Sequence, residues 1–77
     1  MMKLKDRIKE ARKARGLTQP QLAELCGVTR QAVYYWESGK REPSLEASVC
    51  LAKNLELKLL DLIGETKFQE LSDLLRR

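Results

Sequence analysis

The residues with the clearest chemical potential lie between positions 29 and 41. This stretch contains side chains that donate hydrogen bonds or carry positive charge: Thr29, Arg30, Gln31, Tyr34, Tyr35, Lys40 and Arg41. Guanidinium and carboxamide groups can form paired hydrogen bonds with base edges, and cationic groups neutralise phosphates. The chain has no histidine, no glycine-rich phosphate loop and no carboxylate pair placed for catalysis. We therefore expect ligand recognition without a cofactor, and not an enzyme.

The distribution of charge favours a polyanionic partner. The 77-residue chain has a net charge of +4. Residues 1–44 contain ten Lys and Arg against five Asp and Glu, a net +5, whereas residues 45–77 contain five against six, a net −1. One half of the chain therefore presents a positive field. A solvated basic surface without a charged partner explains this asymmetry, taken alone, equally well.

The two cysteines, Cys26 and Cys50, do not indicate a metal site. Without histidine or a Cys-x-x-Cys pair, the chain lacks the ligand set of a zinc site. Cys26 falls on an apolar helix face, where we expect a buried thiol, and we expect Cys50 to be partly exposed. Free thiols favour a reducing, cytoplasmic setting. No apolar run reaches the length of a membrane span, so we expect no membrane partner.

The periodicity of apolar residues predicts an all-α fold, because residues three and four positions apart repeatedly share apolar character. The expected helices span about 2–14, the segment between Thr18 and Gly27, 30–37, 44–55 and 58–63, with a sixth plausible at 66–77. We expect one domain over residues 1–64. A C-terminal amphipathic helix or tail should follow over residues 65–77.

Cap signals mark the start of three of these helices. Thr18, with Gln21 three residues later, forms a capping-box pattern, and Pro20 lies in the first turn, where its missing N–H does no harm. Thr29 and Ser44 have the same N-cap chemistry. We therefore expect the third and fourth helices to begin directly after these two residues.

The segments on either side of Gly27 have the properties of two helices joined by a tight bend. Such a bend needs a residue that tolerates positive φ, here Gly27, and a small residue where the backbones approach, here Ala23. The side chains expected to face inward are Leu22, Cys26, Val28, Val33 and Trp36. The next helix is expected to carry the apolar residues Leu45, Val49, Ala52 and Leu55.

Residues 17–44 resemble the helix-turn-helix family of lambdoid phage repressors and Cro proteins, the XRE-type transcriptional regulators. The shared features are the Leu-Thr-Gln start, the Gly-Val-Thr turn, the Trp-Glu-x-Gly-Lys closure and the Pro-Ser opening of the next helix. With the flanking sequence, the resemblance covers about residues 4–63. It implies a compact five-helix lambda-repressor-like domain whose third helix, about 29–37, enters the major groove of double-stranded DNA. Pro20 and Cys50 depart from the family pattern.

The resemblance implies base contacts at the start of the third helix. Thr29, Arg30 and Gln31 fall nearest the bases. Arg30 can bind guanine at O6 and N7, and Gln31 can bind adenine at N6 and N7. One turn later, Tyr34 and Tyr35 can pack on a thymine methyl or donate to a phosphate. For either tyrosine, the alternative is a ring lying flat against its own helix.

The resemblance also implies residues that support this contact. Gln19 is expected to bind a phosphate and to brace the third helix through Gln31 or Arg30. Lys40 and Arg41 are expected to contact flanking phosphates, which set register and salt sensitivity rather than sequence preference. For each of these, a plain surface residue is the alternative.

Arg12 and Glu37 match a structural ion pair of the family that links the first helix to the end of the third. Such a pair, when partly buried, holds the two groups together, and removing one partner costs more than removing both. The alternative is two unrelated surface charges.

These features lead to the hypothesis of a sequence-specific DNA-binding repressor that acts as a homodimer on a palindromic operator. Eight apolar residues near the end of the chain exceed the needs of a five-helix core, so we expect them to form the dimer surface: Leu57, Leu59, Leu60, Ile63, Phe68, Leu71, Leu74 and Leu75. The last helix packing on its own domain is the alternative. The alternative function is an antitoxin or adaptor of the same fold that binds a partner protein.

Overall fold

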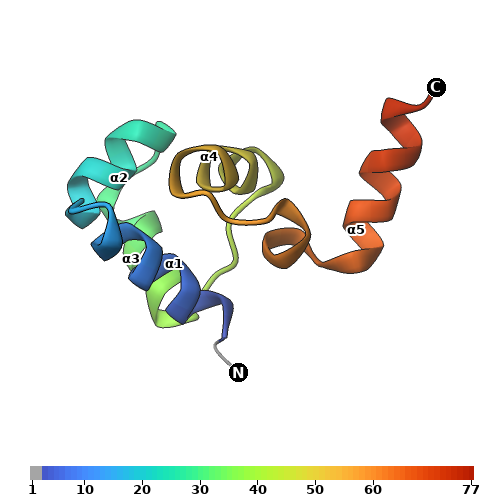
Figure 1. The fold of residues 1–77 in the computed structure, drawn as a ribbon. Helices are drawn as coiled ribbons and strands as arrows, with labels where there is room; N and C mark the ends of the chain where they lie inside the picture. The colour runs from blue at the N-terminus through green and yellow to red at the C-terminus, as the bar shows by residue number, and fades with distance from the viewer. Residues whose placement is uncertain (1–2) are drawn as a thin grey trace.

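The chain folds into five α-helices, with no strand in the part that the structure describes (Figure 1). The structure is a computed structural model that describes residues 3–77, except for the side chain at position 65. In chain order the helices are α1 (Leu4–Ala14), α2 (Gln19–Cys26), α3 (Arg30–Ser38), α4 (Leu45–Leu55) and α5 (Leu59–Leu75). The all-α fold predicted from the sequence is confirmed, and the last two expected helices correspond to two segments of α5.

The predicted caps form the starts of α2, α3 and α4. The Thr18 hydroxyl accepts a hydrogen bond from the Gln21 backbone N at 3.2 Å, and the Gln21 side chain accepts one from the Thr18 backbone N at 2.8 Å. The hydroxyls of Thr29 and Ser44 accept in the same way from the backbone three residues later, each at 3.1 Å. Because each bond satisfies an amide left without a partner at a helix start, these residues fix where the helices begin.

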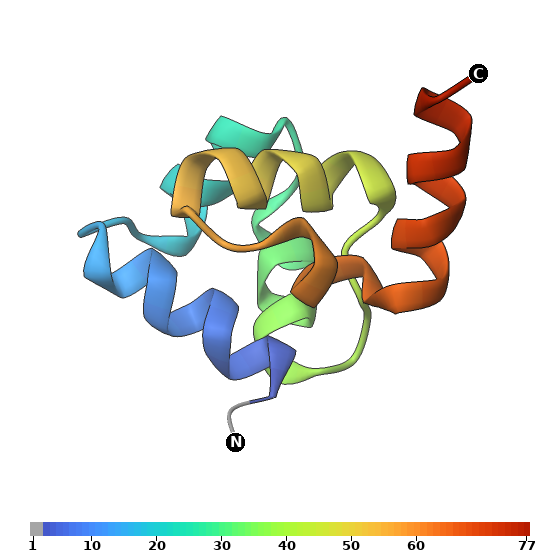
Figure 2. The same ribbon diagram turned by 45° about the vertical axis from the view of Figure 1, so that its right-hand side comes forward.

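The core lies where α1, α2, α3 and α4 meet (Figure 2). Each of these helices contributes one fully buried aliphatic side chain to its centre: Ile8, Leu22, Val33 and Leu51. Trp36 from α3 and Leu62 from α5 are also buried, 6% and 4% exposed. Burial of one side chain of this kind contributes about 1.5–3 kcal/mol. The core therefore holds α3 in a fixed orientation relative to its neighbours.

The buried face of α4 differs from the apolar stripe noted in its sequence. The buried residues of this helix are Ala47, Ser48, Leu51 and Leu55. Of the four apolar residues named for this helix in its sequence, only Leu55 is buried, while Leu45 and Val49 are each 47% exposed. Both stripes have helical spacing, and packing against the other helices selects the one that carries Leu51 into the core.

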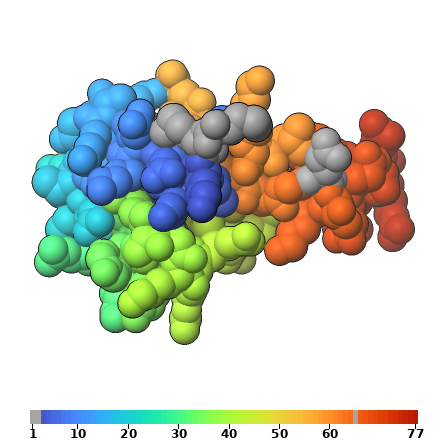
Figure 3. Space-filling model, turned by 90° about the horizontal axis from the view of Figure 1, so that it is seen from below, coloured from blue at the N-terminus to red at the C-terminus, as the bar shows by residue number. Residues whose placement is uncertain are grey.

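A corner at Gly64 divides α5 into two segments. Gly64 has φ 81° and ψ 164°, a combination that is essentially restricted to glycine. The first segment, residues 59–63, contributes Leu62 to the core. The second segment, residues 65–75, which we call the tail helix, projects away from the other helices in both ribbon views (Figures 1 and 2). In the space-filling view it forms one end of the molecule (Figure 3).

The tail helix presents apolar side chains to solvent. Phe68, Leu74 and Leu75 are 36%, 59% and 78% exposed, whereas Leu71 is partly buried. A groove of about 610 Å³ is lined by Leu60, Thr66, Phe68, Gln69, Glu70 and Asp73. The chain's own residues therefore leave much of this apolar stripe uncovered.

Candidate nucleic-acid interface

The bend between α2 and α3 is built around Gly27. This residue ends α2 with φ 64° and ψ 32°, in the left-handed region that favours glycine. The backbone N of Val28 then donates to the Ala23 carbonyl at 3.0 Å. Ala23 is only 3% exposed, and its small side chain lets the two helices approach. α2 and α3 therefore form a helix-turn-helix pair.

The first turn of α3 faces solvent. Thr29, Arg30 and Gln31 are all exposed. The Thr29 hydroxyl accepts from the Ala32 backbone and keeps its proton for another acceptor. Arg30 forms no ion pair or side-chain hydrogen bond with the groups that the structure describes. It therefore presents its guanidinium donors to solvent at the leading end of the helix.

Two tyrosines and two cations gather at the other end of α3. The ring centroids of Tyr34 and Tyr35 are 6.0 Å apart. The Lys40 Nζ lies 6.0 Å and 5.8 Å from these two centroids, and the Arg41 Cζ lies 5.4 Å from that of Tyr35. Such cation–π contacts contribute about 0.5–1 kcal/mol each at exposed sites. These four residues, the aromatic–basic cluster, therefore keep two positive charges beside α3.

Tyr35 also reaches the start of α3. Its hydroxyl oxygen accepts a hydrogen bond from the Gln31 amide nitrogen at 2.7 Å. A groove of about 370 Å³ opens beside this pair and is also lined by Val28, Thr29, Ala32, Trp36, Arg41, Glu42 and Ser44. This pairing was not predicted from the sequence, although a spacing of four residues on a helix brings two side chains to the same face.

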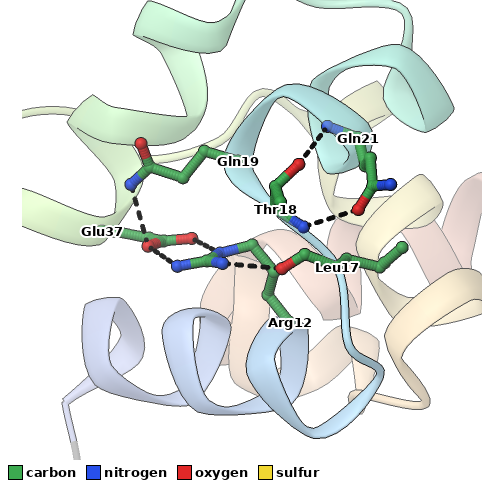
Figure 4. A network of polar contacts seen from close by, with 6 residues as sticks. All are labelled: Arg12, Leu17, Thr18, Gln19, Gln21 and Glu37. Carbon is green, nitrogen blue, oxygen red and sulfur yellow. Dashed lines mark hydrogen bonds and ion pairs between the residues drawn. The ribbon is translucent and has the colours of Figure 1, made fainter.

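A buried polar network joins α1, the start of α2 and the end of α3 (Figure 4). Arg12 donates to both carboxylate oxygens of Glu37, from Nε at 2.7 Å and from Nη2 at 3.0 Å. It also donates to the Leu17 carbonyl at 2.7 Å. The side chains of Arg12 and Glu37 are only 9% and 4% exposed. Hydrogen bonding to Glu37 raises the pKa of Arg12, although burial opposes the shift.

Gln19 belongs to this network and does not reach the first turn of α3. Its amide nitrogen donates to Glu37 Oε1 at 3.2 Å (Figure 4). The expectation that Gln19 braces Gln31 or Arg30 is therefore wrong. Gln19 instead braces the last turn of α3, because the buried Glu37 carboxylate is a charged acceptor within reach. The phosphate contact of Gln19 stays a prediction.

The two cysteines lie where α2 meets α4. Cys50 Sγ donates to the Leu25 carbonyl at 3.5 Å and accepts from Asn54 Nδ2 at 3.2 Å. Both thiols are free and half-buried, so Cys26 is less buried than expected. Burial, together with the neighbouring Cys50 thiol, raises the pKa of Cys26 to about 12. The Cys26 thiol therefore stays protonated and acts in packing, not as a nucleophile.

Two classes of site have no support in the described part of the chain. Among these residues, no group of three or more His, Cys, Asp or Glu side chains is arranged to hold a metal ion. In the same residues, no helix combines the length and the apolar character needed to cross a membrane.

The fold and this surface define a helix-turn-helix domain. Residues 8–62 match the family model described as Helix-turn-helix, and the chain belongs to that family. The chain is accordingly a DNA-binding transcription regulator and not an enzyme.

Three similar proteins carry regulatory names. The cryptic phage CTXphi transcriptional repressor RstR of Vibrio cholerae is 34% identical over 76 residues, covering 99% of this chain and 68% of that protein. The HTH-type transcriptional activator BcrR of Enterococcus faecalis is 35% identical over 63 residues and 82% of this chain, which spans only 31% of BcrR. The P22 c2 repressor protein, solved in complex with synthetic operator 9T, has a TM-score of 0.75 and 29% identity, over 84% of this chain and 100% of that chain. The resemblance to phage repressors is therefore confirmed.

Proposed function

We propose that the chain is a sequence-specific transcriptional repressor that binds double-stranded DNA with α3 in the major groove. The observation that carries this proposal is the exposed first turn of α3, which the Thr29 cap defines and the buried Arg12–Glu37 pair holds in place. A helix presented in this way directs its leading end toward base edges. The P22 c2 repressor, similar in fold and sequence, was solved with an operator.

Arg30 and Gln31 are the proposed base-reading residues. Arg30 matches guanine O6 and N7, and Gln31 matches adenine N6 and N7. Each such pair contributes about 1–3 kcal/mol of discrimination against the wrong base. Thr29 and Tyr34 border the same surface, where they meet a thymine methyl or a phosphate.

Lys40, Arg41 and Gln19 are the proposed phosphate contacts. Lys40 and Arg41 hold their charges beside α3, within the aromatic–basic cluster. At the start of α2, backbone N–H groups favour an anion, although Pro20 removes one of them. The Gln19 amide gives one N–H to Glu37 and keeps the second for a phosphate oxygen.

Selection of binding sites from random duplexes tests the DNA-binding proposal. An enriched sequence with two-fold symmetry would support it, whereas the absence of any enriched sequence would contradict it.

Arg30→Ala and Gln31→Ala should each relax the preference at one position of the half-site. Lys40→Ala should instead weaken binding to all duplexes alike and reduce the salt slope by about one, because it removes a phosphate contact.

A homodimer formed through the tail helix is part of the proposal. Half-sites of a palindromic operator lie about 34 Å apart, so a two-fold dimer can place one copy of α3 on each. The uncovered side chains of Phe68, Leu74 and Leu75 supply the apolar contact.

Sedimentation of the full chain tests this dimer. Leu74→Glu should convert the dimer into a monomer, because a charge at a 59% exposed position blocks an apolar contact without entering the core. Leu25→Glu, at a 52% exposed position on α2, is the matched control and should leave the mass unchanged. A monomeric parent chain would contradict the dimer and leave the tail helix free for a different protein, as in an antitoxin or adaptor.

A further inference from the structure

The Gln31 amide is held by a residue one turn further along α3. Its Nε2 donates to the Tyr35 hydroxyl oxygen at 2.7 Å, although Gln31 itself is exposed. Gln19, from which a bracing contact was expected, is bound to Glu37 instead. An exposed glutamine ordinarily samples several conformations, and selecting one of them for binding costs free energy. A hydrogen bond that forms before the ligand arrives reduces that cost.

Tyr35 is a well-fixed partner for this hydrogen bond. Its side chain is half-buried, and its ring lies 5.4 Å from the Arg41 Cζ and 5.8 Å from the Lys40 Nζ. Its backbone carbonyl accepts a hydrogen bond from the Lys40 N at 3.0 Å. A tyrosine also has only two side-chain torsions, so little conformational entropy remains to be lost.

We propose that Tyr35 is a positioning residue that orients the Gln31 amide to read adenine, a role that rests on the proposed DNA-binding function. The amide has two N–H groups and one carbonyl oxygen. Tyr35 takes one N–H, and the other N–H and the carbonyl remain. These two groups are the donor and acceptor that adenine N7 and N6 require.

The direction of this hydrogen bond follows from the chemistry of the phenol. A tyrosine hydroxyl has a single proton. When a DNA phosphate takes that proton, on the side where Lys40 and Arg41 place their charges, only lone pairs remain for Gln31. Gln31 must then turn its NH₂ group toward Tyr35 and its carbonyl toward the base. The reversed amide would exchange the positions of its acceptor and its donor, so that an N–H would face the adenine N6 donor and the carbonyl would face the N7 acceptor, which does not match adenine.

Binding measurements on Tyr35→Phe test this role. The position read by Gln31 is identified as the base pair whose preference falls most in Gln31→Ala. Tyr35→Phe keeps the ring and removes the hydroxyl, so the adenine preference at that position should fall about 2- to 10-fold, the range that one hydrogen bond supports. Preferences elsewhere and the melting temperature should not change. Ser38→Ala is the control, because it removes an exposed hydroxyl of α3 that bonds the Tyr35 backbone carbonyl and not Gln31, and it should keep every preference.

A double-mutant cycle separates positioning from direct contact. In the Gln31→Ala background, Tyr35→Phe should cause no further loss of preference, because the amide it orients is gone. Three results would overturn the positioning role of Tyr35. They are an unchanged adenine preference in Tyr35→Phe, the same loss of preference in both backgrounds, and a uniform loss of affinity with the preference intact. A parent protein that selects no sequence would instead contradict the proposed function, so the two failures are distinguishable.

Discussion

At the scale of single residues, two ion pairs of nearly equal length differ in how deeply they are buried. Burial decides how much each pair matters for the stability of the fold. The closest N–O distance is 2.7 Å in Arg12–Glu37 and 2.8 Å in Arg15–Glu56. The side chains are 9% and 4% exposed in the first pair, but 41% and 80% exposed in the second. Water screens an exposed pair, whereas a buried charge without its partner is costly. Only the first pair can therefore be essential for the position of α3.

Glu37→Ala should lower the free energy of unfolding by about 3–5 kcal/mol, because it leaves the Arg12 guanidinium buried without its carboxylate. Glu56→Ala, the matched change in the exposed pair, should lower it by less than about 1 kcal/mol. Urea unfolding measures both effects. The double variant Arg12→Met with Glu37→Leu should recover most of the loss. Equal effects of the two single substitutions would contradict this account of burial.

Cys26 makes the stability of the fold sensitive to alkaline pH. Its pKa rises from 9.0 to about 12 on folding, through burial and the Cys50 thiol. Above pH 9 the unfolded chain therefore loses a proton that the folded chain keeps, so stability falls as the pH rises. The stabilisation that comes from the protonated Cys26 thiol is complete below pH 9 and is lost progressively toward pH 12.

Urea unfolding at about pH 8 and about pH 10.5, under reducing conditions, checks this linkage. The parent chain should lose more stability between the two conditions than Cys26→Ala, which has no thiol at this position. Equal losses would show that other groups cause the alkaline sensitivity.

The types of the interface residues could be predicted from the sequence, but their partners could not. A polar run at Thr29, Arg30 and Gln31 follows from the helix pattern and its cap. The partner of Gln19 depends on how α2 and α3 are rotated against each other, and that rotation is set by side chains of the core. In the structure that rotation brings the Gln19 amide to the buried Glu37 carboxylate.

At the scale of helices, starting points were easier to predict than buried faces. The caps at Thr18, Thr29 and Ser44 depend on an amide three residues away, so the necessary information is local. The buried face of α4 depends on helices that are distant in sequence. Two stripes on α4 have helical spacing, and only contact with the rest of the core decides between Leu51 and Leu45.

Leu51→Ala should lower the free energy of unfolding by about 2–5 kcal/mol, because it leaves a cavity at a fully buried position. Leu45→Ala, the same change on the 47% exposed stripe of α4, should cost less than about 1 kcal/mol. Thermal or urea unfolding of the two variants distinguishes the faces. A larger effect at position 45 would show that the face of α4 with Leu45, and not the face with Leu51, packs against the core.

At the scale of the whole molecule, the direction of the tail helix could not be predicted. Its apolar stripe predicts a helix but fits equally well against its own domain or against a second copy. In the structure, the backbone conformation of Gly64 turns the tail helix away from the core (Figure 2). The helical periodicity of the tail residues does not indicate this direction, because the direction depends on the backbone conformation of one residue, Gly64.

Gly64→Ala should redirect the tail helix and leave the core intact. A residue with a Cβ pays about 1–3 kcal/mol to adopt this conformation. Apart from its neighbours in the chain, none of the described atoms lies within 4 Å of the position that a Cβ would occupy, so we expect backbone strain, and not a steric clash, to cause the effect. We expect sedimentation to show a weakened dimer, with little change in the melting temperature. A dimer as tight as that of the parent would contradict this expectation.

The corner at Gly64 also bears on the layout of an operator. In the proposed homodimer, the angle at this corner governs how far apart the two copies of α3 stand and how they are rotated about the DNA axis. Each base pair added between half-sites shifts the second one by about 3.4 Å and about a tenth of a turn. Substitutions at position 64 should therefore alter the preferred spacer length and leave the bases favoured within each half-site unchanged.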